Sequence, residues 1–245
     1  MKPSRKGHHC CFIERGKRMI RIENVDGWGF AHAIRGMRNP MNSWEKSDTM
    51  TFQSGDGGMI FTLGKDDAGL MHRLFKGGTE HRKFMRQIMV SMDITAPLYW
   101  WKEFDTYKVG TVANSCSTMH KIMSKEFVLD DFSHDRVSDP DVAAWFVDTV
   151  HLLNQIRDSY LEADDEKTKK RLWWNIIQAL PSSYNQKRTV TMNYEVAATM
   201  IRQRTGHKLD EWRVFVEMLS GLPYMGIIIN GDWGKEGENN GDQEG

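Results

Sequence analysis

Apolar and polar residues alternate from Ile88 to Thr95, and this is the clearest local pattern in the chain. A period of two is typical of a β-strand with one buried face. Pro97 follows directly, and proline is favoured at the first position of a helix. The pattern therefore predicts a strand that leads into a helix rich in aromatic residues. We expect these aromatics to pack in the core or at a subunit interface rather than to stack on bases; they are Tyr99, Trp100, Trp101 and Phe104.

Other segments carry the period of an α-helix. Asp139-Pro140-Asp141 has the composition of a helix start, and a long apolar stripe follows it. The stripe consists of Val142, Trp145, Phe146, Leu152, Leu153, Ile156 and Tyr160. We also predict an early strand at 21–28 and helices over 30–37, 66–75, 172–180, 193–204 and 209–219. The charged run 162–170 is expected to be a solvated connection.

Length and composition limit the classes of protein to consider. The 245 residues suit one α/β domain over 19–230, with a basic arm at 1–18 and a disordered tail at 231–245. Because 33 basic residues balance 33 acidic ones, no overall field favours nucleic acid. No apolar run approaches the roughly 20 residues that span a bilayer. Three cysteines fit a reducing compartment, so we expect a cytoplasmic protein without a membrane or nucleic-acid partner.

Asn193 and Arg204 are the sharpest candidates for binding chemistry. They are 11 positions apart, about three helical turns, and therefore share one face of the predicted helix. A guanidinium offers five donors in a planar fork that suits a phosphate or the polar edge of a pyrimidine. The alternative interpretation is an arginine that pairs with a carboxylate.

A second candidate is the polar run from Asn114 to Thr118. Its hydroxyl groups and backbone N–H groups can wrap a phosphate, although many capping loops have the same composition. Cys116 lacks a neighbouring histidine and carboxylate that would activate a nucleophile. His8, His9, Cys10 and Cys11 have no second ligand pair at a metal-binding spacing, so we expect no metal site.

An ordered set of spacings resembles the flavin-dependent thymidylate synthases. His81 stands 15 positions before Ala96-Pro97, Asn193 stands 12 after Pro181 of a Leu-Pro pair, and Arg204 follows 11 later. The likeness covers about residues 20 to 222. It implies an α+β fold with a central, mostly antiparallel sheet packed against helices. It also implies a homotetramer that methylates deoxyuridylate (dUMP) with FAD, methylenetetrahydrofolate and NADPH.

The resemblance implies a role for each matching position. His81 and Asn193 correspond to residues that contact FAD, and Arg204 to the arginine that binds dUMP and polarises its ring. Glu103 stands where a glutamine reaches the nucleotide, and Asn114 where a glutamate lines the flavin and nucleotide site. Cys116 falls where a serine contacts the nucleotide phosphate, with Ser115 and Ser117 beside it.

The family's motif Arg-His-Arg-x-x-Ser falls on Thr106 to Thr111, and the resemblance implies that Tyr107 and Lys108 would contact the flavin. Lys108 keeps a positive charge but not a bidentate fork. A further nucleotide-binding arginine of the family is Ile177 here, with Lys187 and Arg188 downstream. Three hypotheses follow: a divergent thymidylate synthase, a related enzyme on another pyrimidine nucleotide, and a non-catalytic nucleotide-binding or assembly protein.

Overall fold

The computed structural model describes residues 20–53, 59–117 and 121–232. Its main sheet has four antiparallel strands in the order β1 (Arg21–Trp28), β4 (Met89–Pro97), β6 (Asn185–Asn193) and β5 (Thr111–Ser115). Strands β2 (Met50–Gln53) and β3 (Met59–Thr62) form a separate antiparallel pair. The predicted strands at 21–28 and from Ile88 onward are confirmed, and so is the mostly antiparallel sheet. The basic arm 1–18 and all but the first two residues of the tail 231–245 lie outside the described residues.

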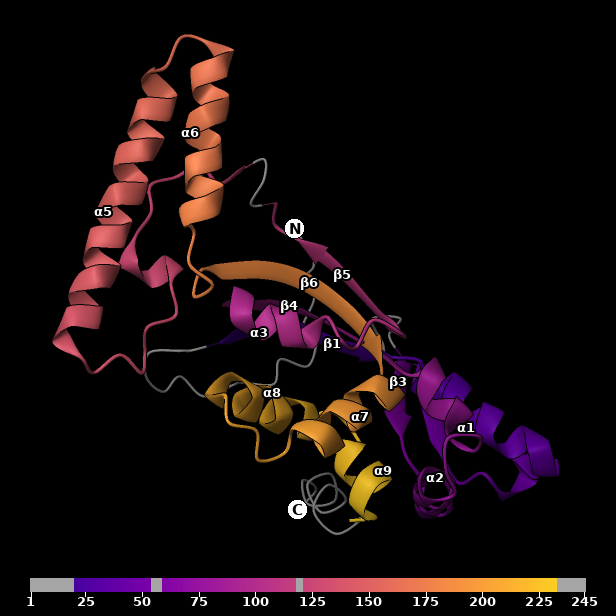
Figure 1. The fold of residues 1–245 in the computed structure, drawn as a ribbon. Coiled ribbons are helices and arrows are strands. Elements are labelled where there is room, and N and C mark those ends of the chain that lie inside the picture. The colour runs from indigo at the N-terminus through magenta and orange to yellow at the C-terminus, as the bar shows by residue number, and fades with distance from the viewer. Residues whose placement is uncertain (1–19, 54–58, 118–120, 233–245) are drawn as a thin grey trace, which may run out of the picture.

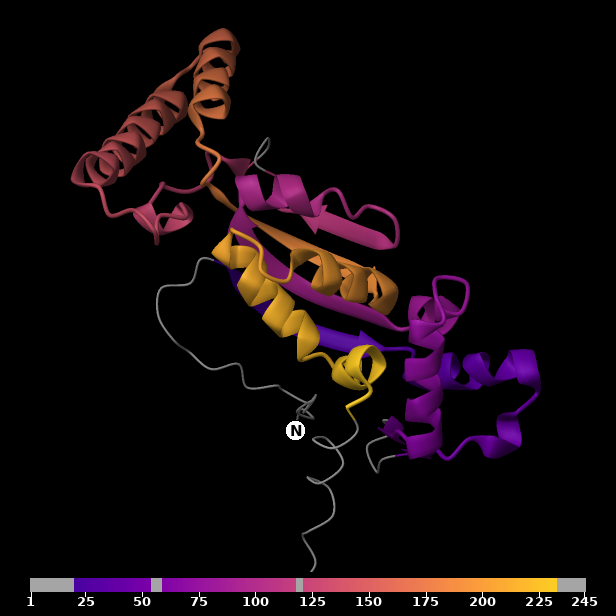
Figure 2. The ribbon, with the colours of Figure 1, turned by 60° about the horizontal axis from the view of Figure 1, so that its bottom comes forward.

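The two faces of this sheet differ in chemistry because β4 alternates strictly. Val90, Met92 and Ile94 are buried, while Ser91, Asp93 and Thr95 are partly exposed. Helices α3 (Leu98–Phe104), α7 (Tyr194–Arg204) and α8 (Asp210–Ser220) cover the apolar face (Figures 1 and 2). No described helix lies over the polar face (Figure 1).

The core between α3 and α8 is aromatic. Trp100 lies 5.0 Å from Trp212 and 5.3 Å from Phe215, measured between ring centroids. Trp101 and Phe104 complete the cluster, and all five rings are at most 2% exposed. Packing is therefore the role of Trp100, Trp101 and Phe104, as predicted.

A smaller layer follows the first strand. It contains α1 (Phe30–Arg38), the short helices η1 (Asn39–Met41) and η2 (Trp44–Lys46), the β2–β3 pair and α2 (Lys65–Lys76). Arg38 donates from Nε to Oδ1 of Asp67 at 2.8 Å, and both side chains are buried. Burial alone would raise the pKa of the Asp67 carboxyl, but hydrogen bonds from Ser47, Thr49 and Arg38 leave it below its usual value. This network ties α1 to α2.

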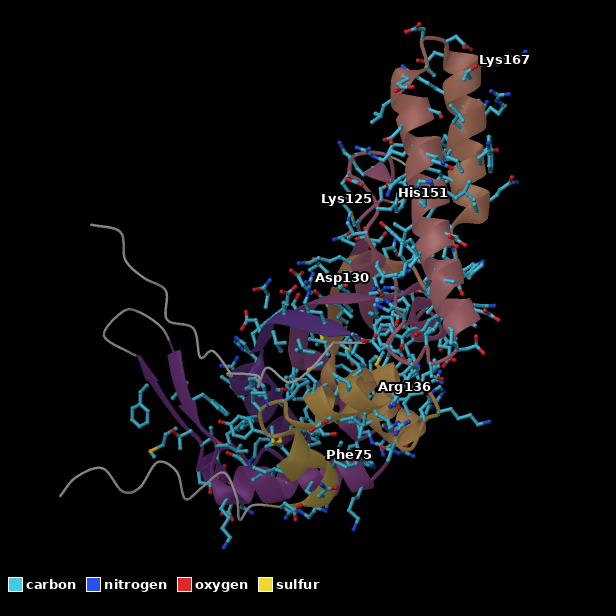
Figure 3. All side chains as sticks on the ribbon, turned by 90° about the vertical axis from the view of Figure 1, so that its left-hand side faces the viewer. Phe75, Lys125, Asp130, Arg136, His151 and Lys167 are labelled. Carbon is cyan, nitrogen blue, oxygen red and sulfur yellow. The ribbon has the colours of Figure 1, made fainter. Side chains whose placement is uncertain are left out.

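A helical hairpin rises from one end of the sheet (Figures 1 and 3). It consists of α5 (Pro140–Glu162) and α6 (Glu166–Ala179), and His151 and Lys167 mark it in Figure 3. The side chain of Asp139 caps α5 by accepting from the backbone N–H groups of Asp141 and Val142. The hairpin packs around its own small core, which includes Phe146, Leu153 and Ile176.

Two details of the hairpin differ from prediction. Val142, Trp145 and Leu152 belong to the predicted buried stripe but are 43%, 49% and 49% exposed, because a single partner helix covers only part of α5. The charged run 162–170 is helical from Glu166, so the connection is confined to residues 163–165. Asp165 begins α6 by accepting from the backbone N–H of Thr168.

The remaining elements are η3 (Arg82–Gln87), η4 (Leu129–Asp131) and α9 (Met225–Asn230). Helix α9 lies beside α2, where Phe75 is labelled in Figure 3, and the imidazole Nδ1 of His72 is 3.0 Å from the carbonyl of Ile228. Among the described helices, none is long and apolar enough to cross a membrane.

The polar face of the sheet generates a prediction about acid stability. The Asp93 carboxylate accepts hydrogen bonds from Thr189 (2.6 Å) and Asn24 (2.9 Å), and Lys187 Nζ lies 3.1 Å away. The Thr189 hydroxyl, then Asn24 and Lys187, lower the pKa of Asp93 to about 2. A lowered pKa means that the folded state favours the carboxylate. Its contribution to stability is therefore present above about pH 4 and lost as the pH falls towards 2.

We expect Asp93→Asn to flatten the decline in the free energy of unfolding between pH 4 and pH 2, measured by urea denaturation. Asp164→Asn is the matched control, since Asp164 is exposed in the hairpin connection. The control should keep the wild-type dependence on pH. The same decline in Asp93→Asn as in the wild type would contradict the assignment.

Candidate functional site

Arg204 is the last residue of α7, and its guanidinium is the centre of the candidate site. Nε donates to the Tyr107 hydroxyl at 3.0 Å, and Nη1 donates to Oε2 of Glu103 at 2.8 Å. The guanidinium carbon also lies 4.7 Å from the ring centre of Trp212, a cation–π contact. The alternative interpretation of Arg204, pairing with a carboxylate, is thus confirmed, and the partner is Glu103. No described residue accepts a hydrogen bond from Nη2.

Glu103 is the acceptor that organises this cluster. Its Oε2 also accepts from Trp212 Nε1 at 3.1 Å and lies 3.3 Å from His207 Nε2. The backbone N–H of Leu209 donates to His207 Nδ1 at 3.1 Å, so the proton of a neutral imidazole is on Nε2 and faces Glu103. Every one of these contacts uses Oε2. Oε1 accepts no hydrogen bond from the described residues, and the Glu103 side chain is 36% exposed.

The segment from Tyr107 to Gly110 lies along α7 and is hydrogen-bonded to it at both ends. At one end, the Tyr107 hydroxyl donates to Gln203 at 2.8 Å and accepts from Arg204. At the other, the carbonyl of Gly110 accepts from the backbone N–H of Asn193 at 3.2 Å. Gly110 has φ of +80°, and a Cβ there would lie 2.7 Å from Nδ2 of Asn193, so only glycine fits. The amide of Asn193 therefore faces the glycine backbone.

Asn193 and Arg204 consequently mark the two ends of one helix. Asn193 caps α7, since its Oδ1 accepts from the backbone N–H of Val196 at 3.0 Å. Eleven residues at 1.5 Å per residue separate the two by about 16 Å. A ligand that touches both must be long.

His81 and Lys108 are exposed at this side of the molecule. His81 precedes η3, which packs against α7. The Arg86–Glu195 ion pair joins the same two elements. Lys108 forms no ion pair with a described residue, so its charge is available to an anion.

Asn114 and Ser115 end the edge strand β5, and Cys116 and Ser117 follow it. Residues directly opposite in an antiparallel pair point to the same face. Asn114 is opposite Thr189 and therefore lies on the polar face, whereas Ser115 is opposite Arg188 on the helix-covered face. Arg188 stacks over Trp101 at 4.2 Å and donates to Asp105 at 2.8 Å. Within one chain, Asn114 and Arg204 are on opposite sides of the sheet.

The structure thus brings Glu103, Tyr107 and Arg204 together, and it places Asn193 next to Gly110. It leaves Asn114, Ser115, Cys116 and Ser117 on or just beyond the edge strand. His207 and Trp212 belong to the Arg204 cluster but were not singled out from the sequence. They approach Arg204 only because the chain turns at Gly206, and no motif marks that contact.

Comparison with known proteins establishes the fold. No protein-family model matches the sequence, and no curated protein matches it. A solved structure of the flavin-dependent thymidylate synthase ThyX from Helicobacter pylori, complexed with FAD and dUMP, superposes with a TM-score of 0.62 at 17% identity. The match covers 86% of this chain and 98% of that one. A second ThyX structure from the same organism, also with FAD and dUMP, gives a TM-score of 0.61 at 16% identity and the same coverage. The predicted fold class is confirmed.

The Arg204 cluster predicts a measurable loss of stability. In Glu103→Ala, the indole N–H of Trp212 and the partly buried guanidinium lose their shared acceptor. We expect the free energy of unfolding to fall by about 1–3 kcal/mol, measured by chemical denaturation. Glu217→Ala, at an exposed position of α8, should change it by no more than about 0.5 kcal/mol. Equal effects of the two substitutions would show that Glu103 does not hold the cluster together.

Proposed function

We propose that this chain is a flavin-dependent enzyme of the thymidylate synthase kind. It would methylate the pyrimidine nucleotide dUMP to dTMP, using methylenetetrahydrofolate and NADPH through FAD. The support is a fold likeness that extends over 98% of a ThyX chain solved with FAD and dUMP. Local support comes from the cluster of Glu103, Tyr107 and Arg204 at positions that the resemblance assigns to the flavin and nucleotide.

The observation that carries the proposal is the hydrogen-bonding pair formed by Arg204 and Glu103. Arg204 Nη2 is a donor, and Glu103 Oε1 is an acceptor, that no described residue uses. Arg204 Nη1 and Glu103 Oε2 are 2.8 Å apart. The unused donor of Arg204 and the unused acceptor of Glu103 are therefore neighbours, and one ligand can contact both. The uracil ring offers the complement, an N–H next to a carbonyl. The rings of Tyr107 and Trp212 pack against the Arg204 guanidinium of this pair.

The donor set at the other end of α7 fits a flavin nucleotide. His81 and the Nδ2 group of Asn193 would offer donors to ring or ribose oxygens, and Lys108, which follows Tyr107 and forms no ion pair with a described residue, would offer its charge to a diphosphate. A flavin bound there would supply hydride and one-carbon transfer.

Arg204 would act on the nucleotide by electrostatics. Methylation at a pyrimidine carbon places negative charge on the ring carbonyls, and a fixed guanidinium stabilises that charge more in the transition state than in the ground state. Glu103 and Tyr107 hold the guanidinium in one orientation. Ser115, Cys116 and Ser117 would hold the nucleotide phosphate at the sheet edge.

A second candidate is the same reaction on a cytosine nucleotide. Glu103 stands where the family has a glutamine, and a carboxylate is only an acceptor. Acidic side chains accept hydrogen bonds from the exocyclic amino group of cytosine. Glu103 Oε1 next to Arg204 is compatible with that edge as well.

Arg204→Ala tests the first proposal. We expect purified wild-type protein to show flavin absorbance and to form dTMP from dUMP, and Arg204→Ala to lower kcat/KM roughly 100-fold or more with its flavin retained. Arg202→Ala removes an exposed arginine from the same helix and should keep full activity. Colourless protein that gains neither colour nor activity from added FAD would overturn the proposal.

The same assay with dCMP tests the second candidate. If Glu103 selects cytosine, kcat/KM for dCMP exceeds that for dUMP, and Glu103→Gln lowers the ratio by removing the pure acceptor. A ratio below one in the wild type would reject the second candidate and leave dUMP as the substrate.

A further inference from the structure

A cavity of about 780 Å³ lies away from the Arg204 cluster, between α1, η2 and the β2–β3 pair. The side chains of α1 that line it include Ala31, Ile34, Arg35 and Arg38, which recur at helical spacing on one face. Another face of α1 packs on η3, where a Cβ on Gly36 would lie 2.8 Å from Gln87. Glu103, Tyr107 and Arg204 take no part in the cavity, so it is a second site.

Aromatic rings form much of the cavity wall. Trp28 and Trp44 line it with 46% and 51% of their surface exposed, which is unusual for side chains of this size. Trp44 is held by a hydrogen bond from its Nε1 to Asn39 at 2.8 Å. Phe30 and Phe61 lie deeper and pack edge-on against Tyr224, with ring centroids 5.5 and 5.8 Å from it. These contacts fix the rings of Trp44, Phe30 and Phe61, and the exposed indoles of Trp28 and Trp44 offer apolar surface to a ligand.

The charged residues that line the cavity in the described part of the chain are all basic. Arg38 is only 5% exposed, and its charge is neutralised by Asp67. Arg35 is exposed and forms no ion pair with a described carboxylate, while its Nη2 lies 3.1 Å from His32 Nδ1. Among the described residues, no aspartate or glutamate lines the cavity. Arg35 thus leaves one uncompensated positive charge beside the exposed rings.

The wall opposite α1 is rigid. Ser47 donates to Oδ2 of Asp67 at 2.6 Å, and the backbone N–H of Thr49 donates to the same oxygen at 3.2 Å. Asp48, between them, accepts from the backbone N–H groups of Asp66 and Asp67 at the start of α2. The segment that carries Ser47 and Thr49 into the cavity is therefore hydrogen-bonded to the start of α2, and Asp67 also binds Arg38 of α1.

We infer that this cavity binds a small planar aromatic anion, with the ring against the indoles of Trp28 and Trp44 and the negative group at Arg35. The inference is independent of the proposed function. A neutral ring would lack the charge-assisted bond to Arg35, and an aliphatic anion would lack the aromatic surface. Only a ligand that combines both features uses the two exposed indoles and the Arg35 charge together.

The test uses 2-naphthoate as the probe, with 2-naphthamide as its neutral analogue and acetate as an anion without a ring. Isothermal titration of the full chain should show 2-naphthoate binding roughly tenfold or more tightly than 2-naphthamide, because one charge-assisted bond is gained. Acetate should not bind measurably. Equal affinity for the two naphthalene compounds, or no binding of either, would overturn the inference.

Matched variants locate the binding. Arg35→Gln should abolish the preference for 2-naphthoate, and Trp44→Ala should weaken both naphthalene compounds. Arg202→Gln and Trp145→Ala change an equally exposed arginine and tryptophan elsewhere and should leave the titration unchanged. Urea denaturation confirms that each variant is folded. Binding that is lost in Arg204→Ala but not in Arg35→Gln would place the probe in the nucleotide site and overturn the inference.

Discussion

The aromatic contact between α3 and α8 is the constraint on which the candidate site depends. A buried aromatic side chain removes roughly 150–250 Å² from water, worth at most about 4–6 kcal/mol. A hydrogen bond contributes about 1 kcal/mol net. Packing of Trp100 against Trp212 and Phe215 therefore fixes the two helices, and the polar contacts follow from it. Glu103 meets Trp212 and Arg204 because the rings beneath it allow one arrangement of α3 on α8.

Strands and helices that bury one face along their whole length could be predicted from the sequence. Strand β4 alternates strictly because one face is fully covered, and the helix after Pro97 was recognised from its start. Strand β6 was missed, since its sequence NQKRTVTMN contains only two strongly apolar residues, Val190 and Met192. Thr189 and Lys187 lie on the polar face, and Arg188 lies on the helix-covered face, where it stacks over Trp101 and pairs with Asp105. The stripe on α5 was over-predicted because a sequence period does not reveal how wide a sector the partner helix covers.

The sequence identified individual residues of the candidate site, but it did not show which of them are in contact. The interval between Asn193 and Arg204 correctly placed them on one helix. The hydrogen bond from Arg204 to Glu103 joins residues 101 positions apart, and no local sequence pattern predicts it. The cavity beside α1 was missed for the same reason. Its tryptophans come from the end of β1 and from the short helix η2, and the spacing of the two in the sequence does not show that both line one cavity with Arg35.

The segment from Tyr107 to Gly110 has a further consequence through its two attachments to α7. A flexible loop loses conformational entropy when a ligand orders it, and that loss weakens binding. Here Tyr107 is bonded to Gln203 and Arg204, and Gly110 to Asn193, before any ligand arrives. The ordering of this segment is completed during folding. A molecule that binds at Arg204 therefore meets a surface already in its final shape, and its affinity reflects the contacts it makes rather than the disorder it removes.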